Sequence, residues 1–430
     1  MESRFFVDGP INREAMEQEL AAWLAGCKMD LKRVLLIPPD GTRAHSMAGP
    51  ITNMLFHMLQ PAKVKILPAL GTHVPMTWEE KQRIFGPELP ASAYLDHNWR
   101  TDVKTVGVVP GSFVKEVSGG LVDYSITVDI NQEILEGGYD LILSIGQVVP
   151  HEVVGMANYT KNIVVGCGGK DIIDKSHFLG AVYGMEKMMG RDHSPVRQVF
   201  DYTQEHFLRD LPLAYILTVT ETKDEETKVQ GLFIGQEREV FSQAVAMSQR
   251  CNLDLLEKPL KKVVVYLDPN EFRSTWLGNK SVYRTRMAIA DQGELVILAP
   301  GVRMFGEDPE IDRLIRSFGY KTSPEILAAV KSKGELGESL SVAAHLIHGS
   351  SEDRFKITYA VQHLTEAEIR GVNYQYLPYA EAAEVYNLAE LKDGYNLVHG
   401  EEIFYISNPA LGLWALEQDF PQANETLKGE

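Results

Sequence analysis

The first 180 residues alternate between short apolar runs and amphipathic stretches. Apolar side chains recur at helical spacing over residues 13–28, whereas residues 33–37 form an apolar run before two prolines, which predicts a buried strand. Similar patterns predict helices over residues 48–60 and 77–85, the latter opened by Thr77, and strands over residues 64–70, 139–146 and 161–165. Strands that alternate with helices favour a mostly parallel sheet.

Two other stretches complete this outline. Residues 104–130 mix Val and Thr with polar side chains, which predicts a more exposed β-ribbon. Near residue 255 the pattern restarts, because a polar stretch and Pro259 precede a new apolar run at residues 262–267. Further strands are expected at residues 294–301 and 355–359.

The expected fold class is therefore α/β, with two α/β domains of mostly parallel sheet and an active site in the cleft between them. A boundary at about residue 255 gives an N-terminal domain of residues 1–255 and a C-terminal domain of residues 256–430. Only the tail after about residue 420 looks loose.

Composition narrows the class of protein. The chain has 42 Lys and Arg against 59 Asp and Glu, a net charge of −17, which opposes binding to nucleic acid but leaves room for a small anionic substrate. No apolar run reaches the length of a membrane span, and the start lacks the pattern of a signal peptide. Three widely spaced cysteines argue against a disulfide framework. We expect a cytoplasmic protein with reduced thiols and no membrane partner.

Ligands of open α/β sheets bind beyond the carboxyl ends of the strands, so polar residues that follow predicted strands are the first candidates. Asp40 and Arg43 follow the strand 33–37, and the planar guanidinium of Arg43 suits a carboxylate or a phosphate. His73 follows Gly71 after the next strand, and an imidazole can take or give a proton near neutral pH. Each residue alone also fits an ordinary structural role.

A second group of candidates comes later in the chain. His151 follows the strand 139–146, and Lys161, ten positions on, could become a nucleophile if its surroundings remove its proton. His177 lies beyond a glycine-rich stretch, residues 166–169, which could approach a phosphate closely. One imidazole nitrogen of His177 could ligate a metal. Three histidines, an arginine and a lysine on one rim suit acid–base work on an anion, but three histidines could equally bind zinc.

In their order and spacing these residues resemble the lactate racemase family, whose members depend on a nickel-pincer nucleotide. Asp-x-Thr-Arg at residues 40–43 and Gly-Thr-His at residues 71–73 are similar to two motifs of that family. A histidine, a lysine ten residues later and a histidine sixteen residues after that, here His151, Lys161 and His177, are similar to the rest of its pattern.

The resemblance implies a role for each residue. His73 and His151 would be the two acid–base residues, and Arg43 would hold the substrate carboxylate. Lys161 would tether the nickel-pincer nucleotide covalently through a thioamide, His177 would be the protein's ligand to nickel, and Asp40 would help to bind the cofactor or position Arg43. Residues 1–255 would then be the cofactor-binding and catalytic domain, and residues 256–430 would close the cleft.

Two departures from the family pattern stand out. The family commonly has Ser-Gly-Gly-x-Lys at the tether, whereas residues 157–161 here read Ala-Asn-Tyr-Thr-Lys. This difference could reshape the pocket for a larger substrate. The family's second domain also contributes polar side chains near the substrate. The candidates here follow Gly278 at the start of a predicted helix, and they are Lys280, Tyr283 and Arg284.

The leading hypothesis is an isomerase, a racemase or epimerase that inverts C2 of a 2-hydroxy acid by proton-coupled hydride transfer to the nickel-pincer nucleotide. Its partners would be a small anionic 2-hydroxy acid and the proteins that synthesise the cofactor. Two alternatives remain at this point. One is a zinc hydrolase with His73, His151 and His177 as ligands, and the other is a non-catalytic protein that binds a nucleotide cofactor.

Overall fold

The structure is a computed structural model that describes residues 2–7, 9–223, 226–332, 334–410 and 412–420. The predicted loose tail beyond residue 420 lies outside the described residues. The chain divides into two compact units. Unit 1 comprises residues 1–179 and 188–252, and unit 2 comprises residues 180–187 and 253–430.

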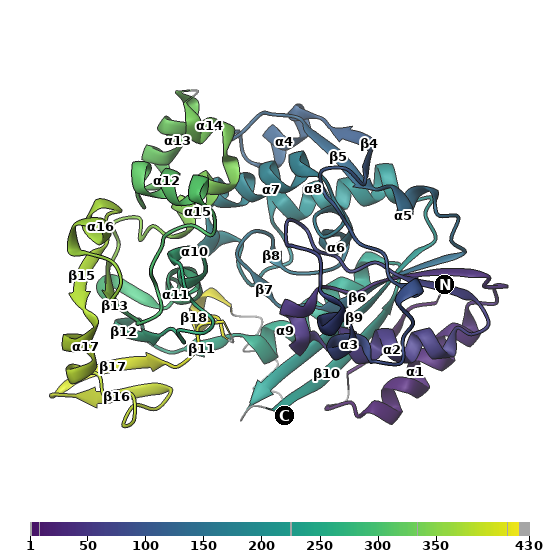
Figure 1. Ribbon diagram of the computed structural model, residues 1–430, viewed down its shortest axis with the longest axis horizontal. Coiled ribbons are helices and arrows are strands. Elements are labelled where there is room, and N and C mark those ends of the chain that lie inside the picture. Colours follow the sequence, from purple (N-terminus) through teal and green to yellow (C-terminus); the bar gives the residue numbers. More distant parts are fainter. Residues whose placement is uncertain (1, 8, 224–225, 333, 411, 421–430) are drawn as a thin grey trace. The chain divides into compact units, whose positions relative to one another are not determined.

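Unit 1 is built on a six-stranded sheet in the order β1-β10-β9-β6-β2-β3. Figure 1 labels β6, β9 and β10 of this sheet. Its strands are β1 (Arg4–Phe6), β2 (Arg33–Ile37), β3 (Lys63–Ile66), β6 (Leu141–Gln147), β9 (Leu213–Lys223) and β10 (Glu226–Gly235). Strands β3, β2, β6 and β9 run parallel to one another, whereas β10 and β1 are antiparallel additions at the edge. The predicted mixed α/β class with mostly parallel pairing is confirmed here, although the long β9–β10 hairpin was not predicted.

The three helices that the periodicity predicted in unit 1 are present around its parallel strands. These helices are α1 (Arg13–Gly26), α2 (Ala48–Met58) and α3 (Trp78–Phe85). Thr77 opens α3 by accepting from the backbone N–H of Glu80, whose side chain accepts from the N–H of Thr77 in return. Apolar side chains of α1 and α2, among them Leu20 and Ile51, pack in one core with the sheet residues Val34 and Leu143.

One predicted strand is wrong. Residues 161–165 belong to the helix α6 (Thr160–Val164), not to a sheet. A short apolar run is equally compatible with a strand and with a buried helical turn, and here a tertiary contact decides. The side-chain amide of Asn162 donates to the carbonyl of Ile37 and to the hydroxyl of Ser144, so the turn lies across the ends of β2 and β6.

The remaining elements of unit 1 flank the sheet. The predicted β-ribbon is confirmed as the antiparallel pair β4 (Val103–Val109) and β5 (Ile126–Asn131). The other elements are α4 (Gly111–Val117), α5 (Gln132–Glu136), β7 (Pro150–His151), β8 (Gly155–Met156), α7 (Lys170–Tyr183), α8 (Pro195–Thr203) and α9 (Arg238–Asn252). The last turn of α7, residues 180–183, belongs to unit 2.

Unit 2 has a second six-stranded sheet, in the order β15-β14-β13-β12-β17-β16. Its strands are β12 (Leu260–Tyr266), β13 (Ile289–Ala299), β14 (Lys356–Val361), β15 (Gln375–Pro378), β16 (Gly394–Val398) and β17 (Glu401–Ile406). All pairs are parallel except that of β16 with β17. The strands predicted at 262–267, 294–301 and 355–359 are confirmed as β12, β13 and β14, each with shifted ends.

Helices and one small sheet complete unit 2. The helices are α10 (Thr275–Gly278), α11 (Lys280–Thr285), α12 (Pro309–Phe318), α13 (Ser323–Lys331), α14 (Glu335–Glu338), α15 (Leu340–His348), α16 (Glu366–Gly371) and α17 (Tyr379–Val385). Strands β11 (Asp254–Leu256) and β18 (Trp414–Leu416) pair in parallel. Helices α12 to α15 pack together as one group (Figure 1). Across the described residues, every helix is too short or too polar to cross a lipid bilayer.

Candidate active site

The adjacent strands β2 and β3 bring Asp40 and His73 together. The strands are in parallel register with Leu36 opposite Ile66, and the pairing continues where Pro39 meets Ala69. The chains that leave these strands therefore emerge side by side. The ring Nδ1 of His73 lies 2.5 Å from a carboxylate oxygen of Asp40, a carboxylate that is only 7% exposed.

This contact fixes the tautomer of His73. A carboxylate can only accept, so Nδ1 carries a hydrogen, and in the neutral imidazole Nε2 is then the nitrogen with the lone pair. The imidazole of His73 is about half exposed, so a small molecule can reach that lone pair. The turn before it is held in place because Gly71, at φ +58°, donates its N–H to the carbonyl of Gly166, 2.8 Å away.

His151 leaves the strand on the other side of β2. Strand β6 pairs in parallel with β2, and the short hairpin of β7 and β8 follows it, with His151 opposite Gly155. The backbone N–H of Val153 donates to Nδ1 of His151 at 3.1 Å, so in this arrangement the hydrogen sits on Nε2. Burial holds the pKa of His151 well below its usual range, and the charges of Lys161 and Arg43 lower it further. His151 is therefore neutral at neutral pH.

Gly155 makes the His151 hairpin possible. Its φ is +88°, and a Cβ atom there would lie 2.3 Å from the carbonyl oxygen of Arg191 and 2.6 Å from that of Met188. Both are backbone atoms, which cannot swing away as a side chain can. A side chain at this position would have to displace the hairpin or the 188–191 segment.

We therefore expect Gly155→Ala to lower the free energy of unfolding by about 2–4 kcal/mol, from the positive φ and the steric clash together. Gly120→Ala is the matched control, because Gly120 has a φ of +84° but open space around the added Cβ. Chemical denaturation of the two variants separates the two contributions. Equal losses would show that the clash at Gly155 is relieved without cost.

Lys161 lies in the first turn of α6, which Asn162 anchors across β2 and β6. Burial lowers the pKa of Lys161 to about 8, and the charge of Arg43 acts in the same direction, while the carboxylates of Glu152 and Asp40 oppose it. A lysine with such a pKa is partly neutral near physiological pH. The free amine is the form that acts as a nucleophile.

Because its pKa is lowered in the folded chain, Lys161 reduces the free energy of unfolding below pH 8. There the side chain is protonated in both the folded and the unfolded chain, so the whole penalty applies; between pH 8 and 10.5 it fades as the folded state releases the proton first. Lys161→Met should therefore raise the free energy of unfolding at pH 7 by on the order of 2 kcal/mol. Denaturation at pH 7 and pH 10.5 tests this expectation, and an equal effect at both pH values would contradict it.

His177 lies in the middle of α7. Its Nδ1 is 2.6 Å from the carbonyl oxygen of Ile173, one turn earlier, so Nδ1 carries the hydrogen and Nε2 is left with its lone pair. Burial and the charge of Lys161 both lower the pKa of His177. A neutral imidazole with one nitrogen bonded to a backbone carbonyl is the usual form of a histidine that ligates a metal.

Arg43 belongs to the short 3₁₀ turn Gly41–Ser46 that follows β2. Its side chain is exposed, and its charge reaches both His151 and Lys161. The charge of Asp40 raises the pKa of Lys161, so the Asp40–His73 pair belongs to the same cluster of residues. The structure thus gathers the six residues predicted in this unit at one edge of the sheet: Asp40, Arg43, His73, His151, Lys161 and His177.

Glu152 also belongs to this group, although the sequence analysis did not select it. Its carboxylate lies 3.8 Å from Nδ1 of His151, and its charge raises the pKa of both Lys161 and His177. Its position directly after His151 is a signal that could have identified it. Glu152 offsets part of the positive charge of Arg43 and Lys161.

The glycine-rich stretch after α6 serves packing. Added Cβ atoms would lie 2.3 Å from the carbonyl oxygen of Asn162 at Gly166, 1.9 Å from that of Val164 at Gly168, and 2.7 Å from Asp129 at Gly169. These glycines let the chain pass close to its own backbone and to β5. Close approach of this loop to a phosphate stays a prediction.

The three candidates of the second domain lie in unit 2. As predicted, a helix, α11, begins at Lys280 after Gly278. The ammonium of Lys280 is 5.7 Å from the centre of the Phe272 ring, and Tyr283 is buried with its ring against His348. Nε of Arg284 is buried without a hydrogen-bond partner among the described residues. Their role at a substrate stays a prediction.

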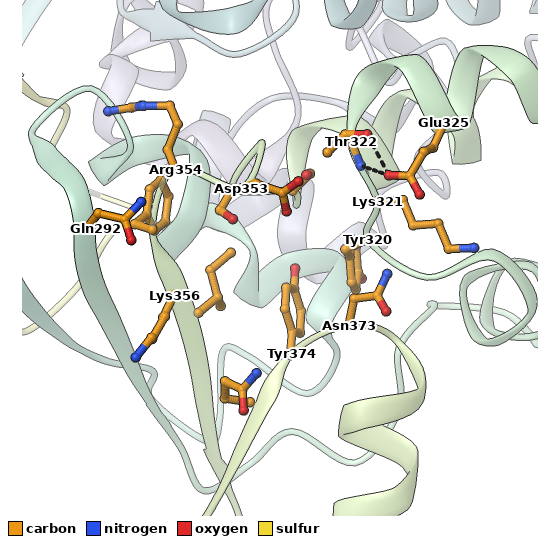
Figure 2. A pocket seen from close by; sticks show the side chains of 15 residues that line it. Gln292, Tyr320, Lys321, Thr322, Glu325, Asp353, Arg354, Lys356, Asn373 and Tyr374 are labelled. Atoms are coloured by element: carbon orange, nitrogen blue, oxygen red, sulfur yellow. Dashed lines mark hydrogen bonds between the residues drawn. The ribbon is translucent and has the colours of Figure 1, made fainter.

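Unit 2 contains a separate pocket of about 490 Å³. Gln292, Lys356 and Gln375 line it from the amino ends of three parallel strands, and Figure 2 shows Tyr320 and Tyr374 side by side in its wall. Thr322 and Glu325 bond to each other at its rim, where they cap α13 (Figure 2). The candidates Lys280, Tyr283 and Arg284 are not part of its lining.

The zinc alternative requires three protein ligands at one point. Among the residues that the structure describes, no group of three or more His, Cys, Asp or Glu side chains is placed to hold a metal ion. His73, His151 and His177 therefore do not form a three-histidine zinc site in this arrangement.

Unit 1 is thus a mostly parallel α/β domain whose ligand edge carries three histidines, a lysine of low pKa and an arginine, a set suited to proton transfer on an anion. Residues 13–190 match the sequence profile of the Lactate racemase N-terminal domain family. The family resemblance that the motifs predicted is confirmed.

Two solved structures share the fold. A crystal structure of a protein from Thermotoga maritima superposes with a TM-score of 0.79 at 22% identity, covering 96% of this chain and all of the other. The lactate racemase apoprotein from Thermoanaerobacterium thermosaccharolyticum gives a TM-score of 0.69 at 17% identity, covering 95% of this chain and 90% of that one. No curated protein matches the sequence. The domain match supports a racemase-type function, and the two solved structures show the fold.

Proposed function

We propose that this protein is a racemase or epimerase that inverts C2 of a small anionic 2-hydroxy acid with a nickel-pincer nucleotide as cofactor. The observation that carries the proposal is the gathering of His151, Lys161, His177 and Arg43 beside the Asp40–His73 pair. Cofactor-synthesis proteins would be its partners, and α11 of unit 2 would supply further substrate contacts through Lys280, Tyr283 and Arg284.

The residues present fit the cofactor. His177 has Nε2 available as a metal ligand because Nδ1 is bonded to the carbonyl of Ile173. Lys161 has the low pKa that lets an amine form a covalent tether. The cofactor, when bound, would supply the acceptor and donor for the hydride on C2 of the substrate.

The chain's own residues would handle the carboxylate and the protons. Arg43 would hold the substrate carboxylate through its guanidinium fork. Nε2 of His73 would take the hydroxyl proton, with the carboxylate of Asp40 stabilising the imidazolium that forms. His151 would serve the opposite stereoisomer, because the hydroxyl groups of the two isomers point in opposite directions.

The two histidines differ in their resting tautomers. His73 presents a lone pair on Nε2, whereas His151 presents a hydrogen there as long as Val153 donates to its Nδ1. In its neutral form His73 can therefore act as a base through Nε2. His151 is ready to donate a hydrogen bond to a substrate oxygen, and it must move its hydrogen to act as a base.

The test is inversion of a panel of 2-hydroxy acids by protein produced together with cofactor-synthesis proteins. The panel contains lactate, longer aliphatic acids, aromatic acids and sugar acids, each supplied as one enantiomer and analysed by chiral chromatography. We expect at least one acid to be inverted, and only by protein that carries nickel. Hydrolysis of esters without inversion would support the zinc alternative, and cofactor binding without inversion of any acid would support a binding protein.

A further inference from the structure

The loop before Lys161 contains two consecutive residues with positive φ. Asn158 has a φ of +69°, and Tyr159 has a φ of +59° with a ψ of −136°. Asparagine adopts such a backbone readily, but tyrosine does not, because its Cβ crowds the backbone there. These are the two positions at which the lactate racemase pattern has glycine. Something in the fold must hold Tyr159 in this conformation.

Side chains at the start of α8 form hydrogen bonds with this loop. The hydroxyl of Ser194 donates to the carbonyl of Val154 at 3.2 Å. One terminal nitrogen of Arg197 donates to the carbonyls of Met156 and Asn158, at 2.9 and 3.2 Å, and the other donates to the hydroxyl of Thr160 at 2.8 Å. These hydrogen bonds of the guanidinium all go to the segment that ends at Lys161.

The side chain of Arg197 is almost completely buried, at 1% exposure. A buried guanidinium costs free energy unless its donors are satisfied, so a purely structural core position would favour an apolar residue. The guanidinium also lies over the ring of Phe241, 4.4 Å from its centre. The ring of Tyr159 stacks on the same Phe241 at 5.2 Å and packs on Tyr215 at 4.2 Å. The aromatic packing and the arginine hold the loop together.

We propose that Arg197 is a positioning residue that fixes the 151–161 segment and, through it, the placement of His151 and Lys161. Met156 pairs with Pro150 next to His151, and Thr160 directly precedes Lys161, so the bonds of Arg197 reach both ends of this segment. Arg197 would act through this segment rather than on a substrate, because its own side chain is buried behind the segment. The proposal rests on the proposed function only for what Lys161 binds, because the placement of Lys161 can be measured in the protein without cofactor.

The experiment measures how fast Lys161 is modified by reductive methylation in the cofactor-free protein, with peptide mass spectrometry and a pH series from 7 to 10. The charged groups that act on Lys161 are Arg43, Glu152, Arg197 and Asp40, and all but the substituted one stay in place. The wild-type profile should have its midpoint near pH 8. In Arg197→Met the loss of the Arg197 charge and the exposure of Lys161 to water by the loosened loop should both move the midpoint up, together by about one unit, a roughly tenfold lower rate at pH 7. Arg197→Lys, which keeps the charge, isolates the effect of the loop.

Arg238→Met is the matched control. Arg238 also lies over Phe241, but its hydrogen bonds go to Asp192, Asp201 and Ser242 rather than to residues 154–160. Its substitution should leave the Lys161 profile unchanged. Thr160→Val removes one partner of Arg197 at nearly constant size, and it should move the midpoint in the same direction by less. It keeps the test decisive if Arg197→Met does not fold.

The proposal would be overturned if Arg197→Met lost thermal stability but kept the Lys161 profile of the wild type. If Arg197→Met does not fold, an unchanged Lys161 profile in Thr160→Val would overturn it. In either case Arg197 would be a core residue only. Failure of the proposed function looks different. In that case no acid is inverted, while the shift of the Lys161 profile in Arg197→Met still appears. Arg197→Lys keeps the charge but cannot reach three acceptors, so it should resemble Arg197→Met rather than the wild type.

Discussion

Lys161→Ala is expected to abolish both the covalent retention of the cofactor and the inversion of 2-hydroxy acids. The amine of Lys161 is the group that would form the tether, and its pKa of about 8 makes it the reactive lysine of the site. Intact mass spectrometry of protein produced with cofactor-synthesis proteins should show a mass increment in the wild type. The increment and the bound nickel should be missing in the variant, and inversion should fall to the background rate.

Lys170→Ala is the control for this substitution. Lys170 begins α7, seven residues before His177, and its ammonium pairs with Asp174 on the surface. This variant should keep the mass increment, the nickel and the activity. If Lys161→Ala keeps the increment, the tether is elsewhere. If it loses the increment but still inverts the substrate at the wild-type rate, the tether is not needed for the reaction.

The second large effect is expected at His73. Removal of the imidazole in His73→Ala should lower kcat for inversion by about a hundredfold to ten-thousandfold, the usual contribution of a general base. The substitution should change stability little, because the side chain of His73 is about half exposed. Asp40→Asn should lower the rate in the same direction, since an amide cannot stabilise the imidazolium as a carboxylate does.

His57→Ala is a suitable control, because His57 is an exposed histidine on α2 whose ring faces Glu88. Its rate should equal that of the wild type. A rate for His73→Ala within a few-fold of the wild type would remove His73 from the acid–base assignment. In that case His151 would be the one remaining acid–base residue, and the pH dependence of kcat would be assigned to it.

The arrangement of the site follows from strand order, which is why much of it could be predicted. Apolar runs at 33–37 and 139–146 identified β2 and β6. In a parallel sheet the carboxyl ends of neighbouring strands lie together, so Asp40, His73 and His151 were expected at one edge. The hydrogen bond between Asp40 and His73 is a direct consequence of the β2–β3 register.

The parts that escaped prediction depend on contacts that leave no pattern in the sequence. The apolar run after Lys161 is a helix because Asn162 bonds to two separate strands, which periodicity does not reveal. Arg197 was not selected because most of its partners are backbone carbonyls, which every residue has. The positive φ of Tyr159 could not be foreseen, since tyrosine rarely adopts it.

The most direct test of the account follows the hydrogen on C2 during inversion. Cofactor-loaded protein is given one enantiomer of its substrate labelled with deuterium at C2, and the products are separated by chiral chromatography with mass detection. Transfer of a hydride away from C2 and back to the opposite face predicts an inverted product that keeps the deuterium in ordinary water. An inverted product that carries solvent hydrogen at C2, or the lack of any inverted product, would contradict the proposed function.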